Sequence, residues 1–95
     1  MKFECHITVS VSDAELASAI AKDMNWSTSQ IARDPILGDD TYFYLTCHSE
    51  SYLHIHNKMQ STTQWLFKNK IPVIRNKIEL IMHDHRYPPK VENDR

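Results

Sequence analysis

Near the N-terminus, a short segment carries side chains suited to acid–base, metal-binding or phosphate-binding chemistry. Residues Phe3–Val11 alternate apolar and polar types without a break, which is the period-two pattern of a half-buried strand. One row of that strand presents a carboxylate, an imidazole and two hydroxyls, carried by Glu4, His6, Thr8 and Ser10. The other row is apolar and is expected to face the core. The search for function therefore begins on one face of one strand.

Two later segments are expected to place polar side chains on the same face. Thr41–His48 alternates again, and its aromatic and β-branched content favours a strand. Val73–His83 is predicted to be the last strand, with an inward row of Ile74, Ile78, Leu80 and Met82. The outward rows of the two strands are Tyr42, Tyr44, Thr46 and His48, and Arg75, Lys77, Glu79, Ile81 and His83.

Two amphipathic helices and one weaker strand complete the pattern of elements. The helices are expected at Asp13–Met24 and Tyr52–Asn69, where apolar residues recur every three or four positions. Asn25–Ala32 mixes Trp, Thr and Ile with Ser, and it is interpreted as a second strand at a sheet edge. The order of elements is then β-α-β-β-α-β.

Serine residues precede both helices at positions suited to capping. Ser12 and Glu15 form the Ser-x-x-Glu pattern of a capping box, in which each side chain bonds the backbone N–H of the other residue. Ser51 stands where its hydroxyl can cap the second helix.

This order of elements predicts an α+β domain of the ferredoxin-like type. Interleaved right-handed crossovers give an antiparallel sheet of order 4-1-3-2, with both helices on one face and the other face open. The first strand is then central and antiparallel to the third and fourth, so Glu4, His6, His48 and His83 are expected to gather at one edge of the open face. The core is expected to combine the inward rows of the first and third strands with Leu16, Ile20, Ile55, Met59 and Leu66.

The composition indicates one domain and no membrane span. Ninety-five residues suit a single domain, expected at residues 1–85 with a flexible tail at 86–95. No apolar run reaches the roughly 18 residues that a membrane span needs, and no signal-peptide pattern is present, so a cytoplasmic protein is expected.

The net charge of −1 divides into −5 over residues 1–50 and +4 over residues 51–95, with the positive residues scattered. Cys5 and Cys47 lack metal-type spacing and are expected to be buried thiols.

Two binding uses of the open face follow from its residue types. The first is a protein partner, including a second copy of the chain, because Tyr42, Tyr44 and Arg75 are interface-type residues. The second is nucleotide or nucleic-acid binding, in which aromatic side chains stack on bases. Tyr42, Tyr44, His6, Arg75 and Lys77 favour this use, whereas Glu4 and Glu79 interrupt the positive surface.

A third use is chemistry at the histidines. His6, His48 and His83 are placed where three imidazoles could bind a metal ion. Isolated histidines on a polar face are the commoner arrangement, so we expect a non-enzymatic binding protein without a resident metal or other cofactor. The residues expected to bind its partner or ligand are His6, Thr8, Tyr42, Tyr44, His48, Arg75, Lys77, Glu79 and His83.

The run His6-Ile7-Thr8-Val9 resembles one half of the His-x-Thr-x signature of two-histidine phosphoesterases. The resemblance implies that His6 acts as acid or base and that Thr8 holds a phosphate. Such enzymes carry the signature twice, and neither His48-Ser49-Glu50 nor His54-Ile55-His56 supplies the second copy. A phosphoesterase, based on histidine or on a metal, is therefore an alternative to a binding protein.

Five separated groups of residues extend a second resemblance over the whole chain. They are His6-Ile7-Thr8-Val9, Asn25-Trp26 with Ser29, Asp34-Pro35-Ile36-Leu37-Gly38, Tyr44 with Thr46 and His48, and Arg75 with Lys77-Ile78-Glu79. In these groups the chain is similar to small uncharacterised proteins of bacteria and large tailed phages. The similarity implies a small α/β fold and a cytoplasmic setting (the host cytoplasm for a phage protein). It also implies an accessory role, such as blocking or modifying a host protein. The ending Met82-His83-Asp84-His85 departs from the pattern.

Overall fold

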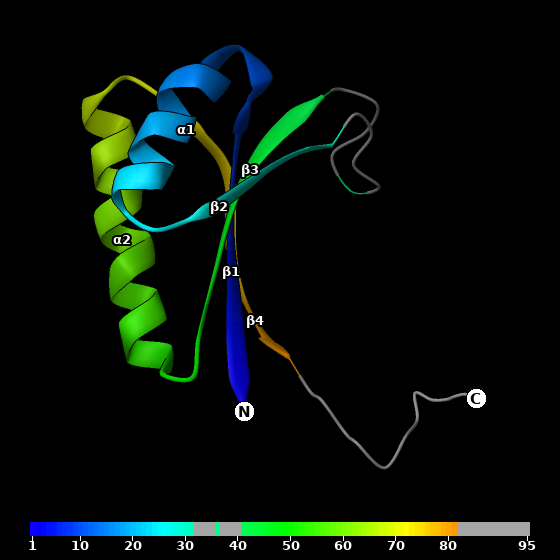
Figure 1. The fold of residues 1–95 in the computed structure, drawn as a ribbon, viewed down its shortest axis with the longest axis vertical. Helices are drawn as coiled ribbons and strands as arrows, with labels where there is room; N and C mark the ends of the chain where they lie inside the picture. Colours follow the sequence, from blue (N-terminus) through cyan, green and yellow to red (C-terminus); the bar gives the residue numbers. More distant parts are fainter. Residues whose placement is uncertain (32–35, 37–40, 82–95) are drawn as a thin grey trace.

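A computed structural model of the chain describes residues 1–31, 36 and 41–81. Within these residues the elements follow the order β-α-β-β-α-β, with a short 3-10 turn before the first helix (Figure 1). Their bounds are β1 (Lys2–Ser10), η1 (Val11–Asp13), α1 (Ala14–Asp23), β2 (Ser27–Ile31), β3 (Tyr42–Ser49), α2 (Tyr52–Lys68) and β4 (Val73–Ile81). Met82, His83 and the tail predicted at 86–95 lie outside the described residues, as does most of the loop between β2 and β3.

The four strands form one open antiparallel sheet, and both helices pack on the same side of it (Figure 1). The predicted α+β class is therefore confirmed. The strand order is β2-β3-β1-β4, which reads 4-1-3-2 when it is counted from the β4 edge. The described helices include none that is long and apolar enough to cross a membrane.

The core lies between the sheet and the helices and uses the apolar rows that the alternation predicts. Cys5, Ile7 and Val9 of β1 are fully buried, and Leu45 of β3 is buried beside them. Both cysteines are free and buried, as predicted, and they lie directly opposite each other on β1 and β3. Helix α2 covers this layer with Ile55 and Leu66, whereas Met59 is only partly buried. Burial of each large aliphatic side chain contributes about 2 kcal/mol to the free energy of folding.

The face that α1 turns to the sheet differs from the predicted one. Leu16 was expected in the core but is 45% exposed, and Ala17 and Ala21 are fully buried instead. Together with Ile20 and Met24 they form an i, i+3, i+4, i+7 stripe, and Leu16 lies about 100° away from its first member. Small alanines let the helix approach the sheet closely, which a stripe centred on Leu16 would prevent.

The predicted capping box of α1 is wrong, whereas the predicted cap of α2 is confirmed. The turn η1 delays the start of α1 to Ala14, so Ser12 lies too early to cap it, and its backbone N–H is bonded by the Ser10 hydroxyl oxygen at 3.3 Å. Asp13 occupies the N-cap position without a side-chain hydrogen bond. At α2, the Ser51 hydroxyl oxygen accepts from the His54 backbone N–H at 3.1 Å.

Both helices end in a left-handed residue followed by a buried apolar one. Asn25 has φ 68° and Lys70 has φ 62°. After each of them a backbone N–H reaches back over the last turn: Trp26 bonds the Ala21 carbonyl at 2.8 Å, and Ile71 bonds the Leu66 carbonyl at 2.9 Å. This is the Schellman arrangement, in which the residue after the left-handed position packs against the helix. It buries Trp26 and Ile71 at the core edge.

Strand β4 contains a bulge that the alternation did not predict. Thr8 pairs with Arg75 but Val9 pairs with Val73, so Ile74 is the extra residue. Ile74 was expected to face inward but is 44% exposed, and Val73 packs against the core in its place. From Arg75 onward the two rows lie on the predicted faces, although Leu80 is also substantially exposed.

Candidate functional site

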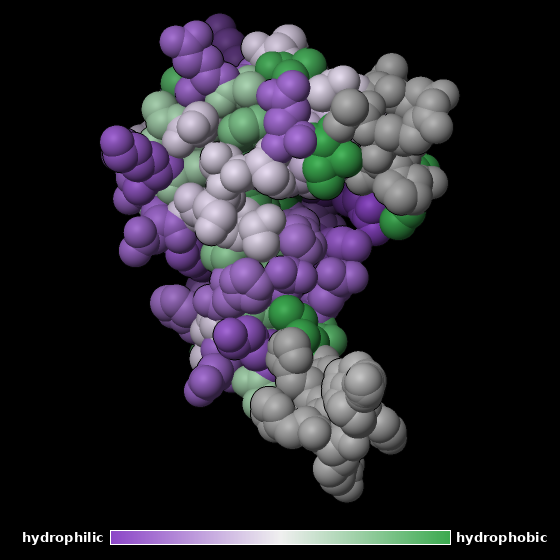
Figure 2. All heavy atoms as spheres, turned by 45° about the vertical axis from the view of Figure 1, so that its right-hand side comes forward, coloured by the Kyte–Doolittle hydropathy of each residue, from purple (hydrophilic) through white to green (hydrophobic). Residues whose placement is uncertain are grey.

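The register of the sheet places the polar row of β1 between polar residues of both neighbouring strands. Three β1 residues on the open face each have one directly opposite partner on β3 and one on β4. Glu4 lies between His48 and Glu79, His6 between Thr46 and Lys77, and Thr8 between Tyr44 and Arg75. Figure 2, in which the open side of Figure 1 is turned partly forward, shows mainly hydrophilic residues across the middle of this face.

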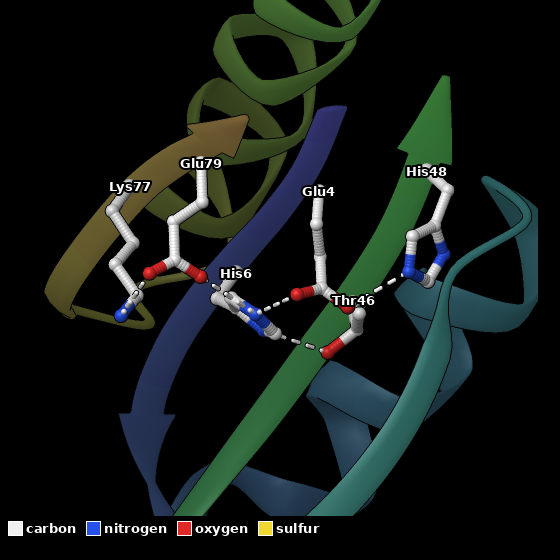
Figure 3. Close-up of polar contacts among 6 residues, drawn as sticks. All are labelled: Glu4, His6, Thr46, His48, Lys77 and Glu79. Atoms are coloured by element: carbon white, nitrogen blue, oxygen red, sulfur yellow. Dashed lines mark hydrogen bonds and ion pairs between the residues drawn. The ribbon is translucent and has the colours of Figure 1, made fainter. Parts of the chain in front are cut away.

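The imidazole of His6 joins three of these residues from three strands (Figure 3). Its Nδ1 forms a hydrogen bond of 3.0 Å with the Thr46 hydroxyl. Its Nε2 lies 3.0 Å from Glu4 Oε1 and 3.6 Å from Glu79 Oε1. We call the imidazole and the two carboxylates that contact its Nε2 the Glu–His–Glu cluster; its members are Glu4, His6 and Glu79.

The second oxygen of each carboxylate in the cluster also has a partner. The His48 Nε2–H donates to Glu4 Oε2 at 2.7 Å, and the Lys77 ammonium lies 3.1 Å from Glu79 Oε2 (Figure 3). Burial alone would raise the pKa of the Glu4 carboxyl, but the hydrogen bonds from His48 and His6 outweigh it and the pKa lies below its usual value. Glu4 is therefore a carboxylate at neutral pH.

The two carboxylates of the cluster face each other across neighbouring strands. Like charges directly opposite in an antiparallel pair destabilise the sheet. Here the Glu4 and Glu79 side chains are separated by the His6 ring and flanked by His48 and Lys77. The cluster thus has the character of a site that favours positive charge between its two carboxylates.

A hollow of about 170 Å³ adjoins the cluster on the open face. We call it the open-face hollow, and the described residues that line it are His6, Thr8, Ser29, Ile31, Tyr44, Thr46, Arg75 and Lys77. Two of these are cationic, none is acidic, and the three from β1 and β3 that bear a hydroxyl lie in its centre by register. Arg75 forms no ion pair with any residue that the structure describes. The described lining of the hollow is thus positively charged, with Lys77 shared with Glu79 and Arg75 outside any ion pair among the described residues.

Burial changes the role that Tyr44 can have. Its side chain was expected to stack on a base, but the residue is only 7% exposed, and Thr8 opposite it is 3% exposed. Both lie on inner strands, where residues of β2 and β4 flank them. Tyr44 therefore lines the hollow with little exposed surface, which disfavours the predicted stacking of a base on its ring.

The structure brings most of the predicted binding residues together and adds two from β2. Of the predicted set, His6, Thr8, Tyr44, Arg75 and Lys77 line the hollow, whereas Glu79 belongs to the neighbouring cluster and His48 contacts that cluster through Glu4. Tyr42 lies on the same face, one row further along β3, and His83 lies outside the described residues. The predictions omitted Ser29 and Ile31, which the alternation of the second strand beside Tyr44 could have indicated.

The chain was compared with models of protein families and with curated protein sequences, and neither comparison finds a significant match. The similarity to small bacterial and phage proteins and the similarity to half of a phosphoesterase signature therefore stay predictions.

Proposed function

We propose that the protein is a binding protein whose open face takes a nucleotide by its phosphate. The supporting observation is the composition of the open-face hollow, which combines Arg75 and Lys77 with hydroxyl groups and has no carboxylate among the described residues that line it. A guanidinium presents paired N–H donors that match two phosphate oxygens, and hydroxyls supply further donors. His6 and Thr8 line the same hollow, which agrees with the phosphate-holding role that the His-x-Thr-x resemblance implies for Thr8.

The size of the hollow favours one charged group over a whole ligand. Pockets that enclose a drug-sized molecule measure about 300–1,000 Å³, and the hollow has about 170 Å³. A phosphate fits inside, so the base and sugar of a nucleotide would lie across the rim, where Ile31 is 43% exposed.

The scattered charge favours a free nucleotide over a nucleic-acid polymer. The chain has a net charge of −1, and the Glu–His–Glu cluster interrupts the positive surface beside the hollow. Binding of a polymer depends on many phosphate contacts along a positive stripe. One cationic hollow supplies contacts for one or two phosphates.

Isothermal titration calorimetry tests this proposal with inorganic phosphate, adenosine monophosphate and a single-stranded oligonucleotide as separate probes. We expect the monophosphate to bind the full-length chain with at least tenfold loss in Arg75→Ala. Lys2→Ala is the matched control, because it also removes one positive charge from the open face of the sheet. Lys2 lies on β1, about 20 Å along the strand from Thr8, which pairs with Arg75. Failure of phosphate and monophosphate to bind, or equal loss in both variants, would overturn the proposal.

A protein partner is the second candidate, and a sheet edge favours it. Strand β2 lies at the edge of the sheet, all five of its residues are exposed, and no other described strand pairs with its outer side, so another strand could add there. A second copy of the chain would give a dimer whose mass light scattering measures directly. A monomeric mass at all protein concentrations would exclude self-association. In the calorimetry, tighter binding of the oligonucleotide than of the monophosphate would show that the ligand is a nucleic-acid polymer and not a free nucleotide.

The element order, the position of β1 in the sheet and the shared side of the helices support a ferredoxin-like arrangement as the finer description of the fold.

A further inference from the structure

The Glu–His–Glu cluster has the spacing of a metal-ion site. Glu4, His6 and Glu79 each contribute one ligand-type atom, and these three atoms lie within 4.8 Å of one another. Donor atoms that bind the same ion at about 2.1 Å, at angles of about 90–110°, are about 3.0–3.5 Å apart. The distances from His6 Nε2 are 3.0 Å to Glu4 Oε1 and 3.6 Å to Glu79 Oε1, and the two carboxylate oxygens lie within 4.8 Å of each other. The set would fit an ion after a side-chain movement of about 1 Å and a shift of the His6 proton from Nε2 to Nδ1, where it would be donated to the Thr46 hydroxyl oxygen.

The second polar atom of each of these three side chains contacts a residue outside the cluster. The His6 Nδ1 bonds the Thr46 hydroxyl, the second oxygen of Glu4 accepts from His48, and the second oxygen of Glu79 pairs with Lys77. In metal sites, an outer layer of this kind fixes the ring orientation of a histidine ligand and the rotation of a carboxylate ligand. Thr46 and His48 thus fix the orientation of the two ligand side chains on β1, whereas the Lys77 ammonium competes with an ion for the Glu79 carboxylate.

Backbone geometry also preorganises the cluster. Glu4 and His6 are alternate residues of β1, and Glu79 lies directly opposite Glu4 on β4, so all three side chains leave the same face of two paired strands. Sites held by strands are more rigid than sites held by loops. A doubly charged ion would also remove the repulsion between the two opposed carboxylates.

We propose that Glu4 Oε1, His6 Nε2 and Glu79 Oε1 bind one divalent transition-metal ion of the Mn²⁺ or Zn²⁺ class. One imidazole nitrogen and two carboxylate oxygens suit such ions, whereas Mg²⁺ and Ca²⁺ prefer oxygen ligands alone. The three protein ligands leave coordination positions open beside the hollow, which His6 also lines. This differs from a site made of His6, His48 and His83, because His48 bonds a ligand carboxylate and contributes from the outer layer.

Lys77 gives the proposal a distinctive signature. Its ammonium pairs with Glu79 at 3.1 Å and is a positive charge beside the ion. Lys77→Met should therefore tighten metal binding, by about fivefold, because a like charge at this distance is removed. His6→Ala and Glu79→Gln should each weaken binding at least tenfold because a ligand atom is lost. A gain in affinity cannot arise from a variant that merely fails to fold.

The test is a titration of the untagged full-length chain with MnCl₂ and, separately, with ZnCl₂ in a phosphate-free buffer. Calorimetry measures the stoichiometry and affinity, and amide NMR locates the ion. We expect one equivalent of ion, and with Mn²⁺ the earliest paramagnetic broadening at the amides of Glu4, His6 and Glu79. His83→Ala with His85→Ala is the control for binding at the histidine-rich ending, and it should leave the affinity unchanged. Thermal unfolding verifies that each variant is folded.

Three results would overturn the metal site: no stoichiometric binding, binding that survives both His6→Ala and Glu79→Gln, or binding that the ending control abolishes. The outcome is separable from that of the proposed function, because Arg75→Ala should weaken the nucleotide monophosphate and leave the metal titration unchanged.

Discussion

The two sides of β1 have different surroundings: the helix side packs in the apolar core, and the open side carries the polar residues of the candidate site. On the helix side, Ile7 and Val9 are fully buried, and both helices pack over this layer. On the open side, Glu4 and His6 contact carboxylate, imidazole and hydroxyl groups from both neighbouring strands. Apolar burial is worth several kcal/mol per residue, whereas partly exposed ion pairs contribute about 0–1 kcal/mol. The contacts of Glu4 and His6 on the open side thus contribute less to the stability of the fold than the buried apolar residues on the helix side.

Substitution of Ile7 should show the largest effect on the helix side. Ile7→Ala is expected to lower the free energy of unfolding by about 2–5 kcal/mol, because it removes buried methyl groups and leaves a cavity in the centre of the core. Chemical denaturation measures this loss. Lys2→Ala, on the exposed open side of the same strand, should change the free energy of unfolding by less than about 0.5 kcal/mol. Equal effects of the two variants would contradict the division between the sides.

A smaller effect is expected where a polar contact lies inside the helix side. The Trp26 Nε1–H donates to the Thr62 hydroxyl oxygen at 3.0 Å, and that hydroxyl donates to the Lys58 carbonyl at 2.8 Å. Thr62→Val should cost about 1–3 kcal/mol because it leaves the buried indole N–H without its acceptor. Trp26→Phe combined with Thr62→Val should cost less than the sum of the two single variants, as a double-mutant denaturation cycle would show. Strict additivity would mean that this hydrogen bond contributes nothing.

The smallest of the three effects concerns pH and the open side. Because the pKa of folded Glu4 lies below the usual value of 4.5, its carboxylate stabilises the fold above pH 4.5. That contribution is lost as the pH falls through the lowered pKa. Glu4→Gln should therefore be less stable than the parent near neutral pH, and the difference should shrink below pH 4.5. Glu50→Gln, at an exposed position before α2, is the control in the same denaturation series. A pH-independent difference would contradict the contacts of Glu4 with His6 and His48.

The comparison of the two sides also shows what the sequence could predict. Strict alternation in Phe3–Val9 determines both faces of β1, since a shift of one residue would bury Glu4 and expose Ile7. The same pattern could not locate the bulge at Ile74, because an extra residue breaks the alternation without leaving a glycine or another local signal. Distances within the open face depend on register, so the convergence of Glu4, His6 and Glu79 required the structure.

The helix ends show a second limit of prediction. The backbone at position 70 is left-handed, a conformation that glycine usually adopts, yet the residue there is lysine. Burial of the following Ile71 compensates for the conformational cost of the left-handed lysine. Trp26 was placed in a strand by its β propensity but packs at the end of α1 instead, where its indole N–H meets Thr62. Tertiary packing, which no local pattern encodes, decides both positions.

Amide NMR during a titration with adenosine monophosphate tests most directly whether the open side is the functional side. We predict saturable shifts at Thr8, Tyr44 and Arg75 around the hollow, with little change along the outer face of α2. Shifts confined to α2 and to the turn at Phe67–Ile71, with the hollow unaffected, would contradict the account.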